Sequence, residues 1–356
     1  MAVIDSLSLR DFRSFNEYEL ALAPGLTVIT GENGRGKSNL VESIGFLSEL
    51  RSFRHAPHDA LVRVGHETAF IRAIGHDNDR ELQIEIELPR VRRARVLVNR
   101  QRLVKTSELA SMLPSVVFSP DDLAIVKGAP SQRRHFLDQL VGVVEPRGAS
   151  LIADYERALK QRNALLKQCG HGRLDESGVL TLDVWDQRLG DLGDVLGQRR
   201  VEVCARLNPI VSKYYHRISP DSAALDVNYS ASWLEEGLAS VLQRHRDDDL
   251  RRSVTSFGPH RDDVALSING MNARVCASQG EQRSLVLSLR LASHELITEA
   301  LGVTPMLLLD DVFSELDPHR SGHLVECLPR CQTLMTSAGD IPSSLEAESV
   351  YALESS

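Results

Sequence analysis

The stretch from Gly31 to Ser38 reads Gly-Glu-Asn-Gly-Arg-Gly-Lys-Ser and has the spacing of a phosphate-binding loop. In such a loop the glycines let backbone N–H groups close around a polyphosphate, and the N-terminus of the next helix adds partial positive charge. We expect Lys37 to reach the β and γ phosphates of a nucleotide and Ser38 to bind Mg2+. The predicted nucleotide-binding residues are Gly31, Glu32, Asn33, Gly34, Arg35, Gly36, Lys37, Ser38 and Asn39.

The residues on either side of this loop are typical of a strand and a helix. The apolar run Leu26–Thr30 precedes the loop and indicates a buried strand. Behind the loop, Leu40, Val41, Ile44 and Leu47 recur at helical spacing. The loop is therefore expected between a strand and a helix, as a phosphate-binding loop requires. The alternative is an ordinary glycine-rich turn before a helix.

Two neighbouring carboxylates, Asp310 and Asp311, follow the apolar run Met306–Leu309. In an α/β sheet, ligands bind outside the carboxyl ends of the strands. We expect Asp310 to hold Mg2+, directly or through water, and Asp311 to orient or deprotonate the attacking water. The alternative is a pair of acids that only caps the next turn.

A second candidate anion site lies at the start of a long predicted helix, whose apolar residues Leu285, Leu289 and Leu296 fall on one stripe. A helix N-terminus attracts anions through its dipole and its free N–H groups. Because one nucleotide does not need two polyphosphate sites, this loop is a candidate for contact with a partner's γ-phosphate. On spacing alone, an ordinary capped helix is the simpler interpretation. The loop consists of Ser278, Gln279, Gly280 and Glu281.

Arginines cluster between residues 90 and 102, with leucine and valine interleaved and no aromatic residue. The chain as a whole carries a net charge of -8, so nucleic-acid binding requires a local basic face of this kind. The alternative is a solvated strand with charges that protect the edge of a sheet.

The composition is that of a soluble globular protein, with 42% hydrophobic and 25% charged residues in 356. No run of about 18 apolar residues indicates a membrane span, and the first residues lack the charged and apolar regions of a signal peptide. We therefore expect a cytoplasmic protein. The five cysteines are scattered without a Cys-x-x-Cys pair and are interpreted as reduced and incidental.

The order of the patterns predicts a discontinuous α/β domain with a helical insertion. Alternation of Leu82, Ile84 and Ile86 with polar residues indicates an antiparallel strand near the nucleotide site. Helical patterns then dominate to about residue 250, and Asn269-Gly270 marks a later hairpin turn. We expect residues 1–120 and 255–356 to form the nucleotide-binding domain and residues 121–254 to form the insertion.

Four motifs in this order resemble the ABC-type ATPases: the phosphate loop, Ser278–Gln282, the double aspartate and Ser314–Asp317. The helical insertion is longer than transporter ATPases carry and too short for the coiled-coil arm of SMC-like proteins. Together with Gly258-Pro259-His260-Arg261-Asp262-Asp263, this intermediate size resembles the RecF family of bacterial DNA replication and repair proteins. The resemblance implies an ABC-type P-loop ATPase head with a mixed sheet and an inserted α-helical subdomain.

The resemblance also implies a function. RecF-like proteins bind ATP and Mg2+, dimerise head-to-tail, bind DNA in that state, and act with RecO and RecR to load RecA at gaps, which supports the SOS response. The Ser278 loop would contact the partner's γ-phosphate, and an interface loop would lie between the subunits. That loop consists of Ser314, Glu315, Leu316 and Asp317. The candidates for DNA contact are Arg92, Arg93, Arg95 and Arg133.

Two positions depart from the transporter pattern. Asp311 stands where transporter ATPases usually carry glutamate, and Thr336-Ser337 stands where they carry a switch histidine. Both departures, which the RecF family shares, suggest slow hydrolysis that acts as a timer. The remaining alternatives are a transporter-type ATPase subunit, a P-loop small-molecule kinase, and a module that holds nucleotide without hydrolysing it.

Overall fold

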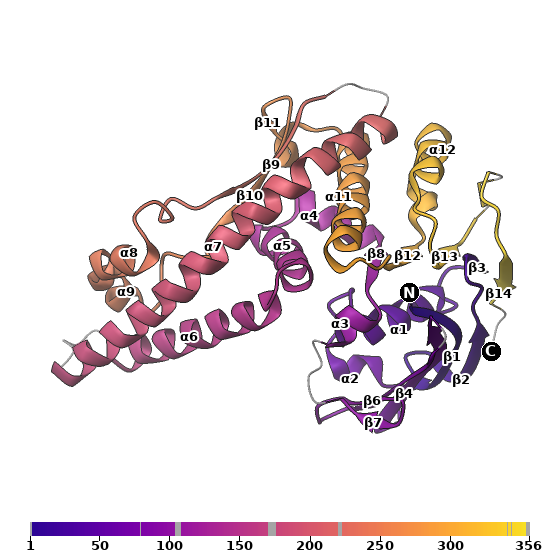
Figure 1. Cartoon of the computed structure of the whole chain (residues 1–356), viewed down its shortest axis with the longest axis horizontal. Coiled ribbons are helices and arrows are strands. Elements are labelled where there is room, and N and C mark those ends of the chain that lie inside the picture. Colours follow the sequence, from indigo (N-terminus) through magenta and orange to yellow (C-terminus); the bar gives the residue numbers. More distant parts are fainter. Residues whose placement is uncertain are drawn as a thin grey trace. The chain divides into compact units, whose positions relative to one another are not determined.

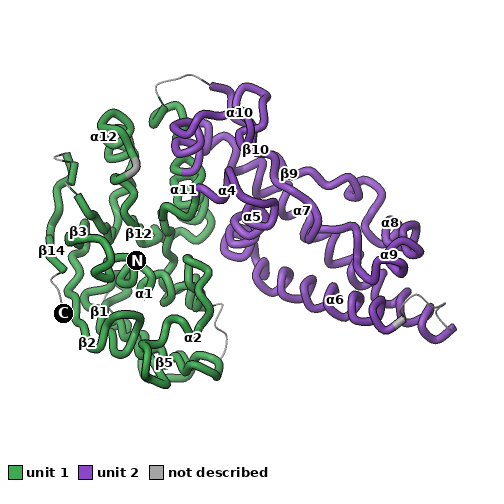
Figure 2. Tube along the Cα trace, turned by 180° about the vertical axis from the view of Figure 1, so that it is seen from behind, with its two compact units in different colours: residues 1–122, 214–220, 287–356 green, residues 123–213, 221–286 purple. Residues whose placement is uncertain are grey.

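The computed structural model describes residues 2–78, 80–103, 108–169, 176–219, 223–339, 341–342 and 344–353. The chain divides into two compact units, which Figure 2 shows in green and purple. Unit 1 comprises residues 1–122, 214–220 and 287–356, and unit 2 comprises residues 123–213 and 221–286. Each unit is described by itself below.

Unit 1 contains a six-stranded antiparallel sheet, and the apolar residues on one face of this sheet form part of the core. Leu7 and Leu9 of strand β1 (Ala2–Phe12) are buried, while Arg10 is exposed. This alternation is typical of a strand with one buried face. The prediction of an antiparallel strand with Ile84 and Ile86 facing the core is confirmed. The strands in order are β2 (Phe15–Ala21), β1 (Ala2–Phe12), β4 (Thr68–Asp77), β5 (Arg80–Pro89), β6 (Arg95–Val98) and β7 (Gln101–Arg102).

The second sheet of unit 1 has five strands, all of whose pairings are parallel. Every residue of the interior strands β13 and β12 is buried, which explains why β12 begins with the continuous apolar run Met306–Leu309 rather than an alternating pattern. The strands in order are β14 (Ser349–Ala352), β3 (Leu26–Thr30), β13 (Thr333–Ser337), β12 (Met306–Asp310) and β8 (Ser115–Phe118).

Helix α1 (Lys37–Glu49) packs against β8, β12 and β13, and its apolar residues join the core formed with the antiparallel sheet. Figure 1 shows α12 on the opposite face of the parallel sheet. The short elements of this unit are α2 (His58–Leu61), α3 (Leu109–Met112), η2 (Pro120–Asp122), η3 (Val312–Glu315) and α12 (Pro318–Cys327).

Unit 2 is built mainly from helices, of which α7 is the longest, as Figure 1 shows. The last residues of α7 belong to unit 1, as does the second half of α11. The helices are α4 (Leu123–Lys127), α5 (Pro130–Val144), α6 (Gly148–Cys169), α7 (Glu176–Ile218), α8 (Leu238–Arg244), α9 (Arg246–Arg252), α10 (Ala273–Cys276) and α11 (Gln279–Leu301). The strands are β9 (Leu225–Ser230), β10 (Asp263–Ile268) and β11 (Met271–Asn272).

The predicted insertion is not purely helical, because β9 lies within it. Strand β9 pairs antiparallel with β10, and Leu225, Val227 and Tyr229 alternate into the interior. This pairing places residues 255–286 in unit 2 with the helices, whereas the sequence division assigned them to the nucleotide-binding domain. The hairpin turn at Asn269-Gly270 is confirmed, with φ of 52° and 76° at its two residues.

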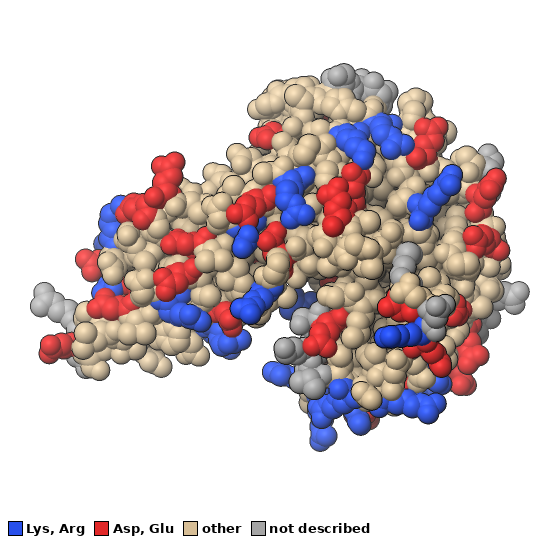
Figure 3. All heavy atoms as spheres, viewed as in Figure 1, with Lys and Arg blue, Asp and Glu red and all other residues tan. Residues whose placement is uncertain are grey.

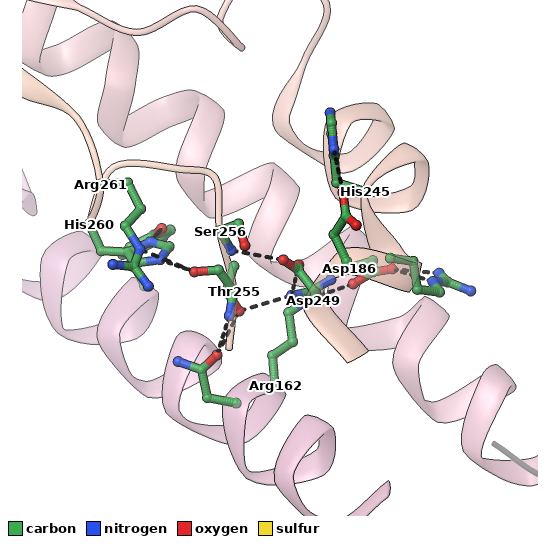
Figure 4. Close-up of polar contacts among 12 residues, drawn as sticks. Arg162, Asp186, His245, Asp249, Thr255, Ser256, His260 and Arg261 are labelled. Atoms are coloured by element: carbon green, nitrogen blue, oxygen red, sulfur yellow. Dashed lines mark hydrogen bonds and ion pairs between the residues drawn. The ribbon is translucent and has the colours of Figure 1, made fainter. Parts of the chain in front are cut away.

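A buried ionic cluster joins helices α6, α7 and α9 of unit 2 (Figure 4). The Arg162 guanidinium donates to Asp186 at 2.6 Å, to Asp249 at 2.7 Å and to the Thr255 hydroxyl at 2.9 Å. All three charged side chains are fully buried, so removing one partner would leave an uncompensated charge. The Asp249 carboxylate also accepts from the Ser256 N–H at 2.9 Å, which anchors the segment that leads to β10.

The described part of the chain contains no helix that is long and apolar enough to cross a membrane. Cys204 and Cys327 are buried, Cys331 is half-buried, and Cys276 is exposed; all four are free thiols. The side chain of Cys169 lies outside the described residues. Burial raises the pKa of the Cys204 thiol to about 12, which keeps it protonated and unreactive.

Candidate nucleotide-binding site

The loop between β3 and α1 has backbone angles that favour glycine at three positions. Gly31, Gly34 and Gly36 have φ of 147°, 83° and 100°. A Cβ at Gly36 would lie 2.8 Å from the Ser14 hydroxyl, and one at Gly31 would lie 2.9 Å from the carbonyl oxygen of Leu353. The glycines are therefore required both by conformation and by close approach, as expected for a phosphate-binding loop.

The side chain of Lys37 turns back into this loop and is only 6% exposed. Its Nζ donates to the carbonyl oxygens of Gly31 at 2.6 Å and Glu32 at 2.9 Å. These carbonyl contacts hold the ammonium against the first two residues of the phosphate-binding loop. A phosphate oxygen in the loop would offer the same ammonium a charged acceptor, which makes a stronger hydrogen bond than a neutral carbonyl.

The parallel sheet aligns the carboxyl ends of β3, β13 and β12 at one edge. Asp310 pairs in register with Thr336, and Ser337 pairs with Thr30 at the end of the phosphate-loop strand. This register brings residues from the two ends of the sequence to one edge of the sheet, the edge where α/β sheets bind ligands.

Asp310 is buried and hydrogen-bonded to both Ser38 and Thr336. The Thr336 hydroxyl donates to Asp310 Oδ1 at 2.9 Å. Burial raises the pKa of Asp310, while the hydrogen bonds from Ser38 and Thr336 act in the opposite direction. The structure thus brings together the two residues that the sequence analysis assigned to Mg2+.

The donor set around Asp310 fits Mg2+ better than a metal that needs an all-protein cage. No group of three or more histidine, cysteine, aspartate or glutamate side chains suited to a metal occurs among the described residues. Mg2+ is usually held by one or two protein oxygens, with phosphates and water completing the octahedron. The Ser38 hydroxyl and the Asp310 carboxylate supply such a pair.

Asp311 lies one residue further on, in a left-handed conformation with φ of 51°. Its N–H donates to the Thr336 hydroxyl at 3.0 Å, and its Oδ1 accepts from the Ala338 N–H at 3.3 Å. A non-glycine residue held at positive φ is uncommon and is typical of functional sites. The carboxylate is half-buried and keeps acceptor capacity for a water molecule.

Three residues near this site were missed by the sequence analysis. Thr336 was noted only as a replacement for a histidine, yet its hydroxyl connects the two aspartates. Arg54 lies close enough to act electrostatically on Asp310, and it donates to Asn39 at 3.5 Å. Glu42 of α1 is fully buried and is bound by Arg13 through two contacts of 2.7 Å. No local pattern marks these residues, because each contact joins distant segments.

The Ser278 loop belongs to unit 2 and closes on itself at the N-terminus of α11. The Ser278 N–H donates to Glu281 Oε2 at 2.7 Å, and the Glu281 N–H donates to Ser278 Oγ at 3.3 Å. This reciprocal pair is a capping box. Ser278 and Gln279 are exposed, and Gly280 is half-buried. Within one chain, the simpler interpretation of a capped helix therefore describes this loop.

The predicted interface loop continues directly from Asp311. The Ser314 hydroxyl donates to the Asp311 carbonyl at 2.8 Å, and Asp317 caps α12 by accepting from the Arg320 N–H at 2.9 Å. Ser314 and Asp317 are exposed, Leu316 is half-buried, and the side chain of Glu315 lies outside the described residues. A displacement of this loop would therefore reach the carbonyl of Asp311.

Three of the four arginines suggested for DNA contact are exposed. Arg92 and Arg93 lie in the turn after β5, and Arg95 begins β6, where it pairs loosely with Glu87 at 3.9 Å. Figure 3 shows basic side chains gathered over the part of unit 1 where Figure 1 labels β6 and β7.

The fourth arginine, Arg133, does not fit this role. It is 6% exposed, and its guanidinium binds Asp263 through contacts of 2.7 and 2.8 Å and the Gly128 carbonyl at 3.1 Å. Its donors are thus used inside unit 2, where it ties α5 to the start of β10. We therefore remove Arg133 from the DNA-contact candidates.

Comparisons with known proteins agree with this architecture. Residues 3–340 match the family described as "RecF/RecN/SMC N terminal domain". The chain is 40% identical to "DNA replication and repair protein RecF" of Streptomyces avermitilis, over 96% of this chain and 95% of that protein. It also resembles the "Structure of the recombination mediator protein RecF-ATP in RecFOR pathway", with a TM-score of 0.90 and 30% identity over 99% of this chain and 95% of that one.

A more distant likeness concerns the fold alone. The "Crystal structure of the SmcHead bound to the C-winged helix domain of ScpA" matches with a TM-score of 0.56 and 16% identity, over 95% of this chain and 90% of that one. The predicted ABC-type ATPase head with a mixed α/β architecture is confirmed. From the family match and the full-length relatives, this chain belongs to the RecF family.

Proposed function

We propose that this chain is an ATP-dependent DNA-binding protein of recombinational repair and replication-gap processing. ATP binding with Mg2+ promotes head-to-tail dimerisation, the dimer binds DNA, and slow hydrolysis resets the cycle. The relatives of this chain support this process, since they include "DNA replication and repair protein RecF" and a RecF–ATP structure of the RecFOR pathway.

The observation that carries the proposal is the contact between Ser38 and Asp310 beside the loop that holds Lys37. A hydroxyl at the start of α1 and a carboxylate at the end of β12 can bind one Mg2+ together, while Lys37 faces the phosphates. When bound, Mg2+ supplies positive charge that stabilises the charge developing on the transferred phosphoryl group. Neither a passive glycine turn nor an isolated acidic cap requires this juxtaposition.

Asp311 is the proposed general base. Its carboxylate is oriented by the Ala338 N–H, and its backbone is fixed by Thr336, so that it can accept a proton from a water molecule near the γ-phosphate. Its side chain is one methylene shorter than the glutamate of transporter ATPases. We propose that this shorter reach makes the chain a weak ATPase, suited to a timed switch.

The Ser278 loop is the proposed contact with the partner's γ-phosphate. Its capping box occupies the Ser278 hydroxyl with the Glu281 N–H at 3.3 Å, a long hydrogen bond that a phosphate oxygen can replace. Ser314 to Asp317 would lie at the same interface, next to Asp311. ATP bound to one chain would thus contact the Ser278 loop of a second chain and join the two chains.

The exposed arginines Arg92, Arg93 and Arg95 are the proposed DNA contacts. Phosphate contacts by arginine give affinity without reading sequence, which suits a protein that recognises DNA by its structure. RecO and RecR are the proposed partners for loading RecA at gaps and supporting the SOS response. The proposed location is the cytoplasm, which is consistent with the absence of a membrane-spanning helix in the described residues.

The experiment that tests this function is sedimentation with a short gapped DNA, with and without ATP and Mg2+. We expect wild-type protein to bind the DNA as a dimer only when ATP is present, and Lys37→Met to show no response to ATP. If ATP-bound wild-type protein remains monomeric and ignores the DNA, the switch is rejected in favour of a kinase or passive nucleotide binder. A transporter-type subunit would hydrolyse ATP without responding to DNA.

A further inference from the structure

Two histidines lie one turn apart on the exposed side of α12. His319 and His323 are four positions apart, the spacing that places side chains above one another on a helix. His319 is exposed, and the side chain of His323 is 37% exposed. The opposite side of the helix is buried through Ser321, Leu324 and Cys327, so the histidine face does not form part of the core.

The two imidazole rings meet through the same ring nitrogen. The Nε2 atoms are 3.3 Å apart, and the ring planes are inclined by 67° with centroids 4.4 Å apart. Two histidine nitrogens bound at about 2.0–2.1 Å to one tetrahedral ion are about 3.3–3.4 Å apart. The rings therefore already have the separation that a shared ion requires.

A simple hydrogen bond between the rings is the competing explanation. It requires one ring to donate and the other to accept, so the two must adopt different tautomers. At 3.3 Å the contact is longer than the common range of about 2.7–3.2 Å for hydrogen bonds from N–H groups. A shared cation would instead use the lone pairs of both Nε2 atoms.

A carboxylate stands behind one of the rings. Glu326 Oε2 lies 3.7 Å from Nδ1 of His323, the nitrogen that faces away from His319. Metal-binding histidines usually donate their second N–H to a carboxylate or carbonyl, which orients the ring and raises its basicity. His319, His323 and Glu326 thus form one stripe on α12. Their order is that of a carboxylate–histidine–metal arrangement, with the carboxylate on one side of the imidazole and the proposed ion on the other.

We propose that His319 and His323 form a binding site for one divalent late transition-metal ion, such as Zn2+, Ni2+ or Cu2+. Imidazole nitrogen favours these ions over Mg2+ and Ca2+, which prefer oxygen. No third histidine, cysteine, aspartate or glutamate of the described residues completes the group, so water fills the remaining positions. The site shares no residue with the proposed nucleotide-binding site.

Occupancy would have a local structural consequence. An ion shared by His319 and His323 links the first two turns of α12, directly after Asp317, which caps the helix through the Arg320 N–H. Since that cap ends the Ser314–Asp317 segment, the ion would fix the point at which this loop enters the helix. The site therefore lies where a metal could adjust the loop that follows Asp311.

The test is calorimetric titration of the full chain, free of any polyhistidine tag, with NiCl2 and ZnCl2 at neutral pH. Excess Mg2+ is included to occupy oxygen sites such as Asp310. We expect one ion per chain for the wild type, and an affinity at least about tenfold lower for His319→Gln and for His323→Gln, since loss of supporting groups alone costs about 10–100-fold. His76→Gln is the matched control, because His76 is 47% exposed but lies next to Asp5 rather than a second histidine.

A second readout distinguishes loss of a ligand from misfolding. The electron paramagnetic resonance spectrum of bound Cu2+ is expected to show two imidazole nitrogens in the wild type and in His76→Gln, and one in either α12 variant. Thermal unfolding without metal is expected to be similar for all four proteins. Absence of Ni2+ and Zn2+ binding to the wild type, or equal binding by the wild type and both α12 variants, would overturn the proposal.

Discussion

The two helix N-termini proposed to bind phosphate, those of α1 and α11, differ in how their backbone N–H groups are capped. Helix α1 follows Gly36, which provides no side-chain cap, and the buried Lys37 lies at its first position. Helix α11 follows Ser278, which closes a capping box with Glu281 on an exposed surface. The first N-terminus has no side-chain cap, whereas the second binds two backbone N–H groups, those of Ser278 and Glu281, with its own side chains.

The phosphate loop can therefore be a permanent site, which binds nucleotide in a single chain. The Ser278 loop would be a conditional site, which binds phosphate only in a dimer. The phosphate loop has its lysine, hydroxyl and aspartate within unit 1, so it can bind nucleotide in a single chain. In the proposed dimer, the Ser278 loop would exchange an internal cap, worth about 0.5–2 kcal/mol, for a phosphate brought by another chain. A contact that forms only against such competition is suited to a switch.

The largest expected effect is on the rate of ATP hydrolysis and comes from changing Asp311, the proposed general base. Asp311→Asn keeps a residue that tolerates the left-handed backbone at φ of 51°, but it removes the proton acceptor. We expect the rate of ATP hydrolysis to fall about 100- to 10,000-fold, with ATP affinity unchanged. Steady-state phosphate release and equilibrium binding measure the two quantities. Wild-type hydrolysis by this variant would remove Asp311 from the reaction.

The next effect concerns nucleotide affinity in the single chain. Lys37→Met removes the ammonium that contacts Gly31 and Glu32 while keeping an unbranched side chain. Loss of a charge-assisted hydrogen bond of about 1.5–3 kcal/mol predicts roughly 10- to 100-fold weaker ATP binding. Fluorescent-nucleotide titration at a concentration where the protein is monomeric checks this. Asp311→Asn is the matched control, and equal affinities for the two variants would show that the first loop is not the nucleotide site.

DNA binding extends the comparison to a third surface. Replacing Arg92 and Arg93 by alanine removes two exposed cations, so the slope of log K against log salt should fall in magnitude by about 1.8. Titration of ATP-bound protein with duplex DNA at several salt concentrations measures this slope. Arg244→Ala is the control, because Arg244 is 56% exposed but paired with Glu236 at 2.6 Å. An unchanged slope in the double variant would place the DNA elsewhere.

The smallest effect is a pH dependence of unit 2, which carries the Ser278 loop. Burial lowers the pKa of His260 to about 4, and its ring contacts Tyr155 at 2.7 Å and the Thr255 carbonyl at 3.0 Å. Because the unfolded chain binds a proton at higher pH than the folded chain, stability falls as the pH drops from about 6.5 to 4.

We expect this histidine to contribute up to about 3 kcal/mol to that loss. Urea unfolding of wild-type protein and His260→Gln at several pH values in this range measures the contribution. The difference in unfolding free energy between the two proteins should shrink as the medium becomes more acidic. A constant difference would contradict the assigned cause.

Local patterns predicted the elements whose residues carry their own signal. The strand before the phosphate loop, the apolar strand before Asp310 and the hairpin at Asn269-Gly270 are all present. Strand β9 was missed although Leu225, Val227 and Tyr229 alternate, because helical patterns surround this short segment. Its assignment depends on pairing with β10, which no local window contains.

Side-chain partners were predictable only where a motif fixes them. The pairing of Ser38 with Asp310 follows from the motif and is present. The burial of Arg133 was not predictable, because its partner Asp263 lies 130 residues further along the chain. Likewise, nothing in the sequence near Thr336 indicates that its hydroxyl joins Asp310 and Asp311. Such contacts depend on the packing of distant segments rather than on residue type.

The most direct test of the conditional site is sedimentation of Ser278→Asp with ATP and Mg2+, beside the wild type. Aspartate caps a helix as well as serine does, so α11 should stay intact, but its charge repels a γ-phosphate. We predict that the variant binds ATP with wild-type affinity yet stays monomeric, while the wild type becomes a dimer. Dimerisation of the variant at the same ATP concentration as the wild type would contradict a role for Ser278 in the partner's site.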